Sequence, residues 1–357
     1  MRPAAAILIL CAGAWAQEAN SGFDLNTTLS QQASYSPHLE DAPRDGAPVT
    51  GGFRAVFYPT WKLSEHWTVS GAVQTYSRPY FYQQFSTQGY GVSTDILQGY
   101  ISYSRFWNGG SLVVRAGQLS SAFGSFLLHY DDADNPLIDI PLSYGYYESG
   151  VTNLGLAGAQ TDLALGKADF RAQFVNSSPA NRRSLFDRDQ YGNWAGGAGY
   201  TIRQGLRVGA SAYRGPYLDR HSKFYFPGEA PPRDLPATAI GLDAQWGWRH
   251  LNLSGEWQHF EFTYRKIPTY TEHTGYVEAR QVLDPRWYVA SRLGYIHASA
   301  GPPRQVYEAV AGFRPNRHQL VKLGYEIQQG PAIHGAHRNV LAVQLVTTLH
   351  AISIAHD

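Results

Sequence analysis

Apolar and polar residues alternate along most of this chain. In the stretch SLVVRAGQL, Val114 and Ala116 fall on one face while Arg115 and Gly117 fall on the other. A period of two residues is the signature of a β-strand with one buried or apolar face. Segments of about ten residues with this pattern recur from end to end and predict sixteen strands. The predicted strands are 23–35, 52–59, 67–82, 95–107, 111–119, 151–165, 168–176, 190–204, 206–214, 237–248, 251–265, 270–282, 287–297, 305–314, 318–328 and 338–350.

The connections between these strands alternate between short and long, with 266–269 as the one short exception among the long ones. Most of the short ones hold two to five residues, such as Asn108-Gly109-Gly110 and Gly166-Lys167, whereas 120–150 is the longest connection in the chain. Short turns on one rim and longer loops on the other are typical of a bacterial outer-membrane barrel. The predicted fold class is therefore all-β: a transmembrane antiparallel β-barrel of about sixteen strands, with the third long loop folded inward.

Composition agrees with a β-rich chain that is exported. Aromatic residues make up 14% of the chain and charged residues only 16%. The opening MRPAAAILILCAGAWAQ predicts a signal peptide over residues 1–16, followed by a single barrel domain over 17–357. The only cysteine, Cys11, lies in the signal peptide, so no disulfide is expected in the mature chain. No later stretch has about 20 uninterrupted apolar residues, but closed barrels can cross a membrane without such a helix.

Two further features refine the barrel. Tryptophan and phenylalanine gather beside the short turns, at Trp61, Trp67, Trp107, Trp248 and Trp287 among others, as expected of rings at a boundary between membrane and water. The net charge is only +1 and no long run of Lys or Arg occurs, so a nucleic-acid partner is not expected.

Charged residues on the polar phase of the strands are expected to line a wet interior. The predicted basic wall residues are Arg54, Arg115, Arg171, Arg207, Arg280, Arg292, Arg314 and Lys322. Five acidic residues share that phase, namely Asp243, Glu256, Glu278, Glu308 and Glu326, which leaves an excess of three positive charges. A barrel of sixteen strands is wide enough for an aqueous channel.

The 120–150 loop carries the predicted constriction, with the acidic residues Asp131, Asp132, Asp134 and Asp139. Folded inward, these carboxylates would oppose the arginines of the wall and narrow the bore. The alternative is an acidic surface loop that extends into solvent.

Four stretches resemble the phosphate-selective porins O and P: SLVVRAGQLSSAFG, TDLALGKADFRAQFVNSS, LRVGASAYRGPYL and GYVEARQVLDPRWYVASRLGYI. The resemblance implies an outer-membrane porin of sixteen strands, usually trimeric, with its third loop in the pore. It implies passive diffusion of small hydrophilic solutes or ions, including anions such as phosphate, and contact with outer-membrane lipid and lipopolysaccharide. Arg115 matches the arginine that precedes Gly-Gln in that group.

The chain departs from the porin O and P pattern in two ways. The modest basic excess and the acidic loop do not make a strong anion trap. The chain also ends in SIAHD rather than on an aromatic residue. Either the last strand ends near Leu349 with a short tail, or the signal for barrel assembly differs.

Two other functions remain open. An outer-membrane lipid or lipopolysaccharide hydrolase could use His259 and Glu261, with His273 nearby, although the chain contains no Gly-x-Ser-x-Gly or HExxH motif. The second alternative is a structural or adhesive barrel without an open pore. No cofactor, metal site or catalytic residue is predicted.

Overall fold

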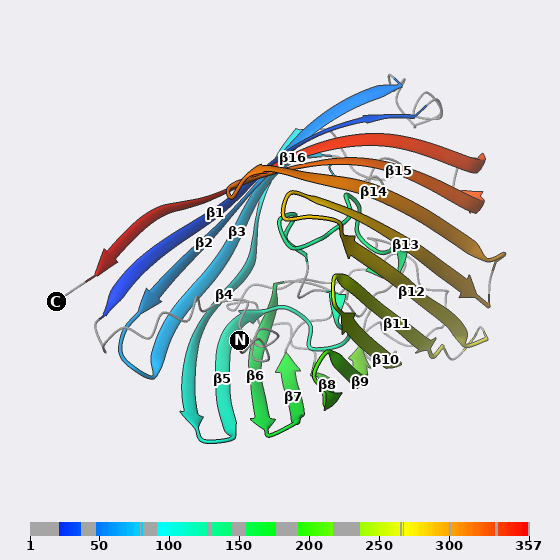
Figure 1. Cartoon of the computed structure of the whole chain (residues 1–357). Coiled ribbons are helices and arrows are strands. Elements are labelled where there is room, and N and C mark those ends of the chain that lie inside the picture. Colours follow the sequence, from blue (N-terminus) through cyan, green and yellow to red (C-terminus); the bar gives the residue numbers. More distant parts are fainter. Residues whose placement is uncertain are drawn as a thin grey trace.

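The chain forms one closed antiparallel barrel of sixteen strands, seen in a computed structural model (Figure 1). The structure describes residues 21–36, 48–78, 80, 91–126, 130–144, 155–175, 192–216, 236–264, 266, 268–299, 301–332 and 335–355. The predicted signal peptide lies outside these residues. No helix among them is long and apolar enough to cross a membrane.

Every strand pairs with its neighbours in sequence, and the first strand closes the barrel against the last. The strands are β1 (Gly22–Tyr35), β2 (Val49–Lys62), β3 (Trp67–Arg78), β4 (Gly91–Trp107), β5 (Gly110–Leu119), β6 (Leu156–Leu165), β7 (Ala168–Val175), β8 (Asn193–Arg203), β9 (Leu206–Pro216), β10 (Pro236–Trp248), β11 (Leu251–Phe262), β12 (Tyr270–Val282), β13 (Trp287–Ala298), β14 (Arg304–Asn316), β15 (Gln319–Ala332) and β16 (Gly335–Ala355). The predicted number, order and approximate bounds of the strands are confirmed.

The seam between β1 and β16 answers the question raised by the C-terminus. The pairing runs from Tyr35 opposite Leu341 to Gly22 opposite Ala355. The last strand therefore continues past Leu349, so that, of the two alternatives given for the C-terminus, the short tail after Leu349 is wrong. Ile352 and Ile354 extend the exposed apolar face, since alternate residues of this segment still point outward.

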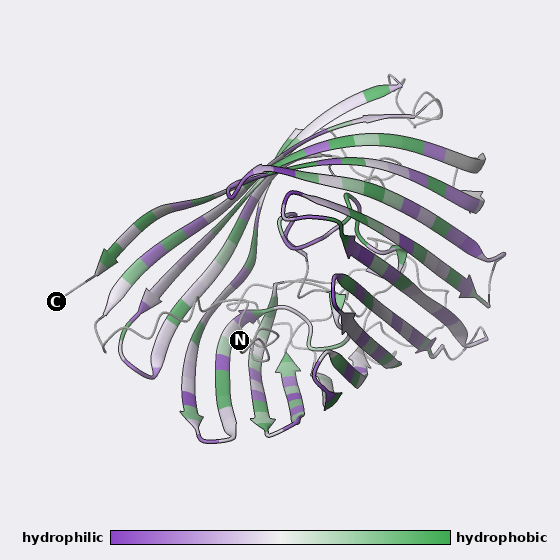
Figure 2. Cartoon of the chain, viewed as in Figure 1, coloured by the Kyte–Doolittle hydropathy of each residue, from purple (hydrophilic) through white to green (hydrophobic). Residues whose placement is uncertain are grey.

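The outer surface of the barrel is apolar, whereas its inner face carries the charged side chains together with apolar ones that pack against the connection between β5 and β6. Phe53 and Phe57 of β2 are exposed, whereas Arg54 between them is buried inside the barrel. Figure 2 shows the alternation of hydrophobic and hydrophilic residues along the strands. A soluble protein does not expose one apolar face all the way round a closed sheet, because an apolar surface of this size in water is costly.

Seven tight turns lie on one rim of the barrel. Those between β4 and β5 and between β6 and β7 stand side by side at the lower edge of Figure 1. Gly109, Gly166 and Gly205 have positive φ in these turns, and so does Arg249 at 53°. Short hairpin turns need this conformation to match the twist of their strands.

Exposed aromatic side chains mark the same rim. Trp61, Trp67, Trp107, Trp248 and Trp287 are all exposed, which agrees with the aromatic band expected from the sequence.

Candidate functional site

The connection between β5 and β6 folds back into the barrel (Figure 1). We call its described residues, 120–126 and 130–144, the inner loop. The backbone N–H of Ala122 donates to the side chain of Gln173 on β7, and that of Gly124 donates to Ser211 on β9. Phe123 packs against Phe260 of β11, with ring centroids 5.7 Å apart. The loop is thus held against inward-facing residues, in agreement with the predicted inward fold.

Glu256 of β11 joins the two ends of the inner loop. Its carboxylate accepts hydrogen bonds from the Tyr144 hydroxyl at 2.7 Å and from the Ser125 hydroxyl at 3.0 Å. Burial and the Glu256 carboxylate hold the pKa of Tyr144 well above its usual range, so this tyrosine remains a proton donor. Gly124 is required at this junction: its φ is +82°, and a Cβ there would collide with the Tyr144 hydroxyl.

Lys322 of β15 holds the middle of the inner loop. Its ammonium group is fully buried and donates to the carbonyl oxygens of Asp132, Asn135 and Leu137, at 2.7, 2.8 and 2.9 Å. A buried ammonium costs free energy unless its donors are satisfied. Three loop carbonyls satisfy all three donors of Lys322.

A row of charges crosses four adjacent strands behind the same part of the loop. Glu278, Arg292, Glu308 and Glu326 are consecutive cross-strand partners on β12 to β15. The Arg292 guanidinium donates to Glu278 at 2.7 Å and lies 3.6 Å from Glu308. Arg292 also donates to the Asp139 carbonyl oxygen at 2.8 Å.

Glu308 completes the attachment of this segment. Its carboxylate accepts the backbone N–H groups of Ile138 at 2.8 Å and Asp139 at 3.1 Å. Wall charges therefore satisfy both the donors and the acceptors of the loop backbone, which has no strand partner of its own.

Arg54 fixes the start of the segment 130–144. Its guanidinium donates to the Asp132 carboxylate at 3.1 Å and to the Tyr130 carbonyl oxygen at 3.2 Å. The Tyr80 hydroxyl donates to the other Asp132 oxygen at 3.0 Å. Both Arg54 and Asp132 are about 1% exposed, so this ion pair is fully removed from water.

The four acidic residues of the predicted constriction differ in their surroundings. Asp132 is paired with Arg54, and Asp131 accepts a short hydrogen bond from the Tyr58 hydroxyl. Asp139 is buried, and its carboxylate accepts the backbone N–H of Ile140. Only Asp134 is exposed. Most of the loop's negative charge therefore faces the wall or the loop backbone rather than open water.

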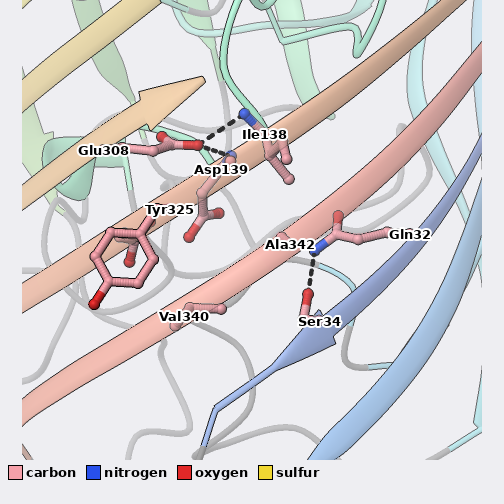
Figure 3. A pocket seen from close by; sticks show the side chains of 10 residues that line it. Gln32, Ser34, Ile138, Asp139, Glu308, Tyr325, Val340 and Ala342 are labelled. Carbon is pink, nitrogen blue, oxygen red and sulfur yellow. Dashed lines mark hydrogen bonds between the residues drawn. The ribbon is translucent and has the colours of Figure 1, made fainter. Parts of the chain in front are cut away.

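A small pocket remains between the inner loop and the wall (Figure 3). It lies where Ile138 and Asp139 face β14, β15, β16 and β1, and Glu308 and Glu326 line it from the barrel side. Glu308 and Glu326 are directly opposite each other in register. The pocket shows that the loop does not fill the space beside this pair of carboxylates.

The opposite part of the wall carries a charged ladder, which we define as Arg115, Asp162, Arg171, Asp169, Arg207 and Asp243 on β5 to β10. Arg115 donates to Asp162 at 2.9 Å, and Arg171 lies 3.4 Å from the other oxygen of the same carboxylate. Arg207 bridges Asp169 at 2.7 Å and Asp243 at 2.8 Å. The three arginine side chains keep 16–26% of their surface exposed, so this part of the wall is hydrated.

The eight predicted basic wall residues thus fall into three groups. Arg54, Arg292 and Lys322 are buried and hold the inner loop, and Arg115, Arg171 and Arg207 belong to the charged ladder. Arg280 and Arg314 lie toward the rim of tight turns, and neither forms an ion pair with the described residues. The Arg280 guanidinium instead lies 4.8 Å from the centre of the Tyr288 ring.

The inner wall is less basic than the sequence count indicated. Asp162 and Asp169 also point inward, which reduces the excess of positive charge on β5 to β9 from three to one, and Asp243 on β10 balances the last arginine of the charged ladder. The alternation that placed Gln173 and Arg171 inward on β7 could have placed Asp169 there as well. Tyr58, Tyr80 and Tyr144 bind the loop carboxylates or Glu256. They had no recognisable sequence signal because these partners lie 73, 52 and 112 residues away, respectively.

The histidines proposed for an enzyme lie on the outside of the barrel. His259 pairs in register with His273, and the ring centroids are 4.4 Å apart. Glu261 lies 3.3 Å from His259. Among the described residues, no group of three His, Cys, Asp or Glu side chains is placed to hold a metal ion. The three residues are close together, as expected, but on the face opposite the inner loop.

Comparisons with known proteins identify the fold. No protein-family model matches the chain, and no curated protein matches it in sequence. An anion-selective porin from Comamonas acidovorans is similar in structure, with a TM-score of 0.65, 11% identity and coverage of 92% of this chain and 100% of that one. OprB of Pseudomonas putida has a TM-score of 0.64 and 12% identity, covering 92% and 94%. OmpT, an outer membrane protein of Vibrio cholerae in a trimer form, has a TM-score of 0.58 and 10% identity, covering 92% and 100%. The chain therefore has the fold of bacterial outer-membrane porins.

Proposed function

We propose that this protein is an outer-membrane porin that lets small hydrophilic solutes or ions diffuse through its lumen. The observation that carries the proposal is the hydrated charged ladder on the inner wall of a barrel whose outer face is apolar. Water-exposed charges inside a closed barrel are costly to keep in a dry core, but they are solvated in an aqueous channel. The porin fold of the structural neighbours supports the same function.

Planar-bilayer recording tests this proposal directly. We expect discrete, stepwise conductance increases from purified protein that is folded in detergent. The alternative is a barrel closed by its inner loop, which the contacts of that loop with β7, β9, β11 and β15 also favour. Absence of current from protein that inserts and remains folded would support the closed barrel and reject the porin.

We further propose a preference for anions. Arg280 and Arg314 form no ion pair with described residues, while three of the four loop carboxylates are engaged by the wall or the loop backbone. A free positive charge near an ion path attracts anions. On the basis of the resemblance to porins O and P, we propose phosphate and similar oxyanions as the solutes. A homotrimer is the assembly proposed by analogy with the trimer form of OmpT.

The charged ladder provides a test of selectivity. Asp162 neutralises both Arg115 and Arg171, so Asp162→Asn leaves two arginines without their carboxylate. A unit charge about 6 Å from an ion in water contributes roughly 0.7 kcal/mol, or about a three-fold change in local anion concentration. We expect the reversal potential in a salt gradient to shift toward anions. The neighbouring outward residue gives the control variant, Thr161→Val, which should leave the reversal potential unchanged.

The surroundings of Asp134 predict that the ion selectivity of the channel depends on pH. Asp134 is exposed but partly desolvated, and this desolvation together with the Asp131 carboxylate raises the pKa of Asp134 to about 6, although Lys322 and Arg314 oppose the rise. Asp134 is therefore negative at pH 7.5 and largely neutral at pH 5. We expect the ratio of anion to cation permeability to rise as the pH falls through 6, and Asp134→Asn to flatten that change. An unaltered pH profile in Asp134→Asn would show that this carboxylate lies outside the ion path.

A further inference from the structure

A ring of basic residues surrounds the barrel at its rim of tight turns. Six of the seven tight turns carry one Lys or Arg in the turn or beside it, and we call these residues the basic turn ring. They are Lys62, Lys167, Arg203, Arg249, Arg286 and Arg317. Only the turn between β4 and β5 lacks such a residue. The same turns contain two acidic residues, Glu65 and Asp284. The rim therefore carries a clear excess of positive charge although the whole chain is almost neutral.

One of the two acidic residues has a structural role in its turn. The Asp284 carboxylate accepts the backbone N–H groups of Arg286 at 2.7 Å and Trp287 at 3.0 Å. Its charge is thus directed to the turn backbone. Among the described residues, no member of the basic turn ring forms an ion pair. The ring is therefore available to anions outside the protein.

The basic turn ring lies just beyond the exposed aromatic residues of the same rim. Trp61 precedes Lys62, Trp248 precedes Arg249 and Trp287 follows Arg286 in sequence. Aromatic side chains collect at the boundary between hydrocarbon and headgroups. A residue one step further toward the turn is then at the depth of the headgroup phosphates.

One contact places a ring residue at the lipid-facing side rather than over the lumen. The Arg249 guanidinium lies 5.1 Å from the centre of the Trp248 ring, and Trp248 is 55% exposed on the outer surface. The Lys167 ammonium donates to the backbone carbonyl oxygen of Ile202 at 3.4 Å, at the end of the adjacent strand β8. Long basic side chains at membrane boundaries keep their stems on apolar surface and their charges in the headgroup layer.

We propose that the basic turn ring binds anionic phospholipid headgroups of the leaflet that surrounds the tight turns. The phosphodiester group of a lipid such as phosphatidylglycerol supplies the negative charge, and the ring supplies spaced cations around the barrel. This inference rests on the membrane location in the proposed function. It does not depend on whether the lumen conducts.

Tryptophan fluorescence can report this binding, because six of the tryptophans lie beside the ring. These are Trp61, Trp67, Trp107, Trp246, Trp248 and Trp287. A Trp194→Phe/Trp257→Phe background removes the two other tryptophans that follow the predicted signal peptide. The protein is reconstituted into vesicles of phosphatidylcholine with a fixed fraction of brominated phosphatidylglycerol or brominated phosphatidylcholine. Bromine quenches only nearby rings, so quenching measures the lipid beside the rim.

We expect brominated phosphatidylglycerol to quench more than brominated phosphatidylcholine, with an association ratio of about three or more at low salt. The preference should decline as salt is added, because exposed charges are screened. A variant with Lys62, Lys167, Arg203, Arg286 and Arg317 changed to Gln and Arg249 to Asn should lose it. Asn is used at 249 because it tolerates the positive φ there. Arg214→Gln, at the opposite end of β9, is the matched control and should keep the preference.

If the six-residue variant does not fold, the triple variant Arg249→Asn/Arg286→Gln/Arg317→Gln is tested instead and should lose part of the preference. Equal quenching by the two brominated lipids around the unmodified ring would overturn the proposal. The proposal also fails if the ring variant keeps the lipid preference and changes only ion selectivity, because the ring would then act on solutes. Absence of conductance together with a preserved lipid preference would reject the porin function alone.

Discussion

Replacing Lys322 by Met is expected to produce a channel that alternates between two conductance levels, the higher of which is absent from the unmodified protein. The substitution keeps the apolar stem of the side chain and removes the ammonium group that binds three carbonyl oxygens of the inner loop. Each buried carbonyl left without a donor costs about 1–3 kcal/mol. The loop segment 132–137 is therefore destabilised by several kcal/mol in its present position.

The apolar packing of the loop stabilises its bound position by an amount similar to what is lost with Lys322. This balance is why two conductance levels are expected. Leu137 and Ile138 are buried against Tyr288, Val310 and other residues of β13 to β16. Exposing each of them costs about 1.5–3 kcal/mol. Because the two amounts are comparable, we expect the loop to exchange between bound and released positions rather than to leave the wall permanently.

Single-channel recording distinguishes the outcomes for Lys322→Met. Lys266→Met removes the same side chain from the short connection between β11 and β12 and serves as the control. A single conductance level, equal to that of the unmodified protein, would show that Lys322 does not hold the loop in the bore. Loss of the folded band on unheated gels would point instead to failure of the barrel itself.

The sequence predicts the barrel well because the strand pattern is local. Alternation at every second residue identifies Arg115 as inward and Val114 as outward, whatever lies on the neighbouring strands. The turns were equally readable, because Gly109, Gly166 and Gly205 mark positions of positive φ in the chain itself. These two signals suffice for strand number, order and topology.

The different roles of the wall charges could not be predicted from this alternation. Arg115 and Lys322 look alike in sequence, since each is a basic residue on the polar phase of a strand. Arg115 is hydrated beside Asp162, whereas Lys322 is buried under a loop more than 180 residues earlier in the chain. Which role each residue takes depends on the path of the inner loop across the lumen, and that path is set by long-range contacts such as Glu308 with Ile138.

Replacing Arg292 by Met is expected to destabilise the barrel more than replacing any of the three arginines of the charged ladder, which are more exposed. Arg292 lies between Glu278 and Glu308 in the cross-strand row, and Glu326 follows Glu308. The substitution leaves these buried or half-buried carboxylates side by side without their central cation. Breaking a buried ion pair by removal of one partner costs about 3–5 kcal/mol. We expect a clear decrease in the temperature at which the folded band converts to the unfolded band on gels.

Two further variants separate charge from packing in this prediction. Arg280→Met removes an inward arginine of the adjacent strand that has no ion pair among the described residues, and a small change is expected. Arg292→Met/Glu308→Gln removes one of the carboxylates left unpaired, so it should recover part of the lost stability if repulsion is the cause. An equal loss in Arg280→Met and Arg292→Met would show that the row of charges contributes little. No recovery in the double variant would assign the loss to the hydrogen bonds that Arg292 donates to Asp139 and Asn135, and with it to the attachment of the inner loop.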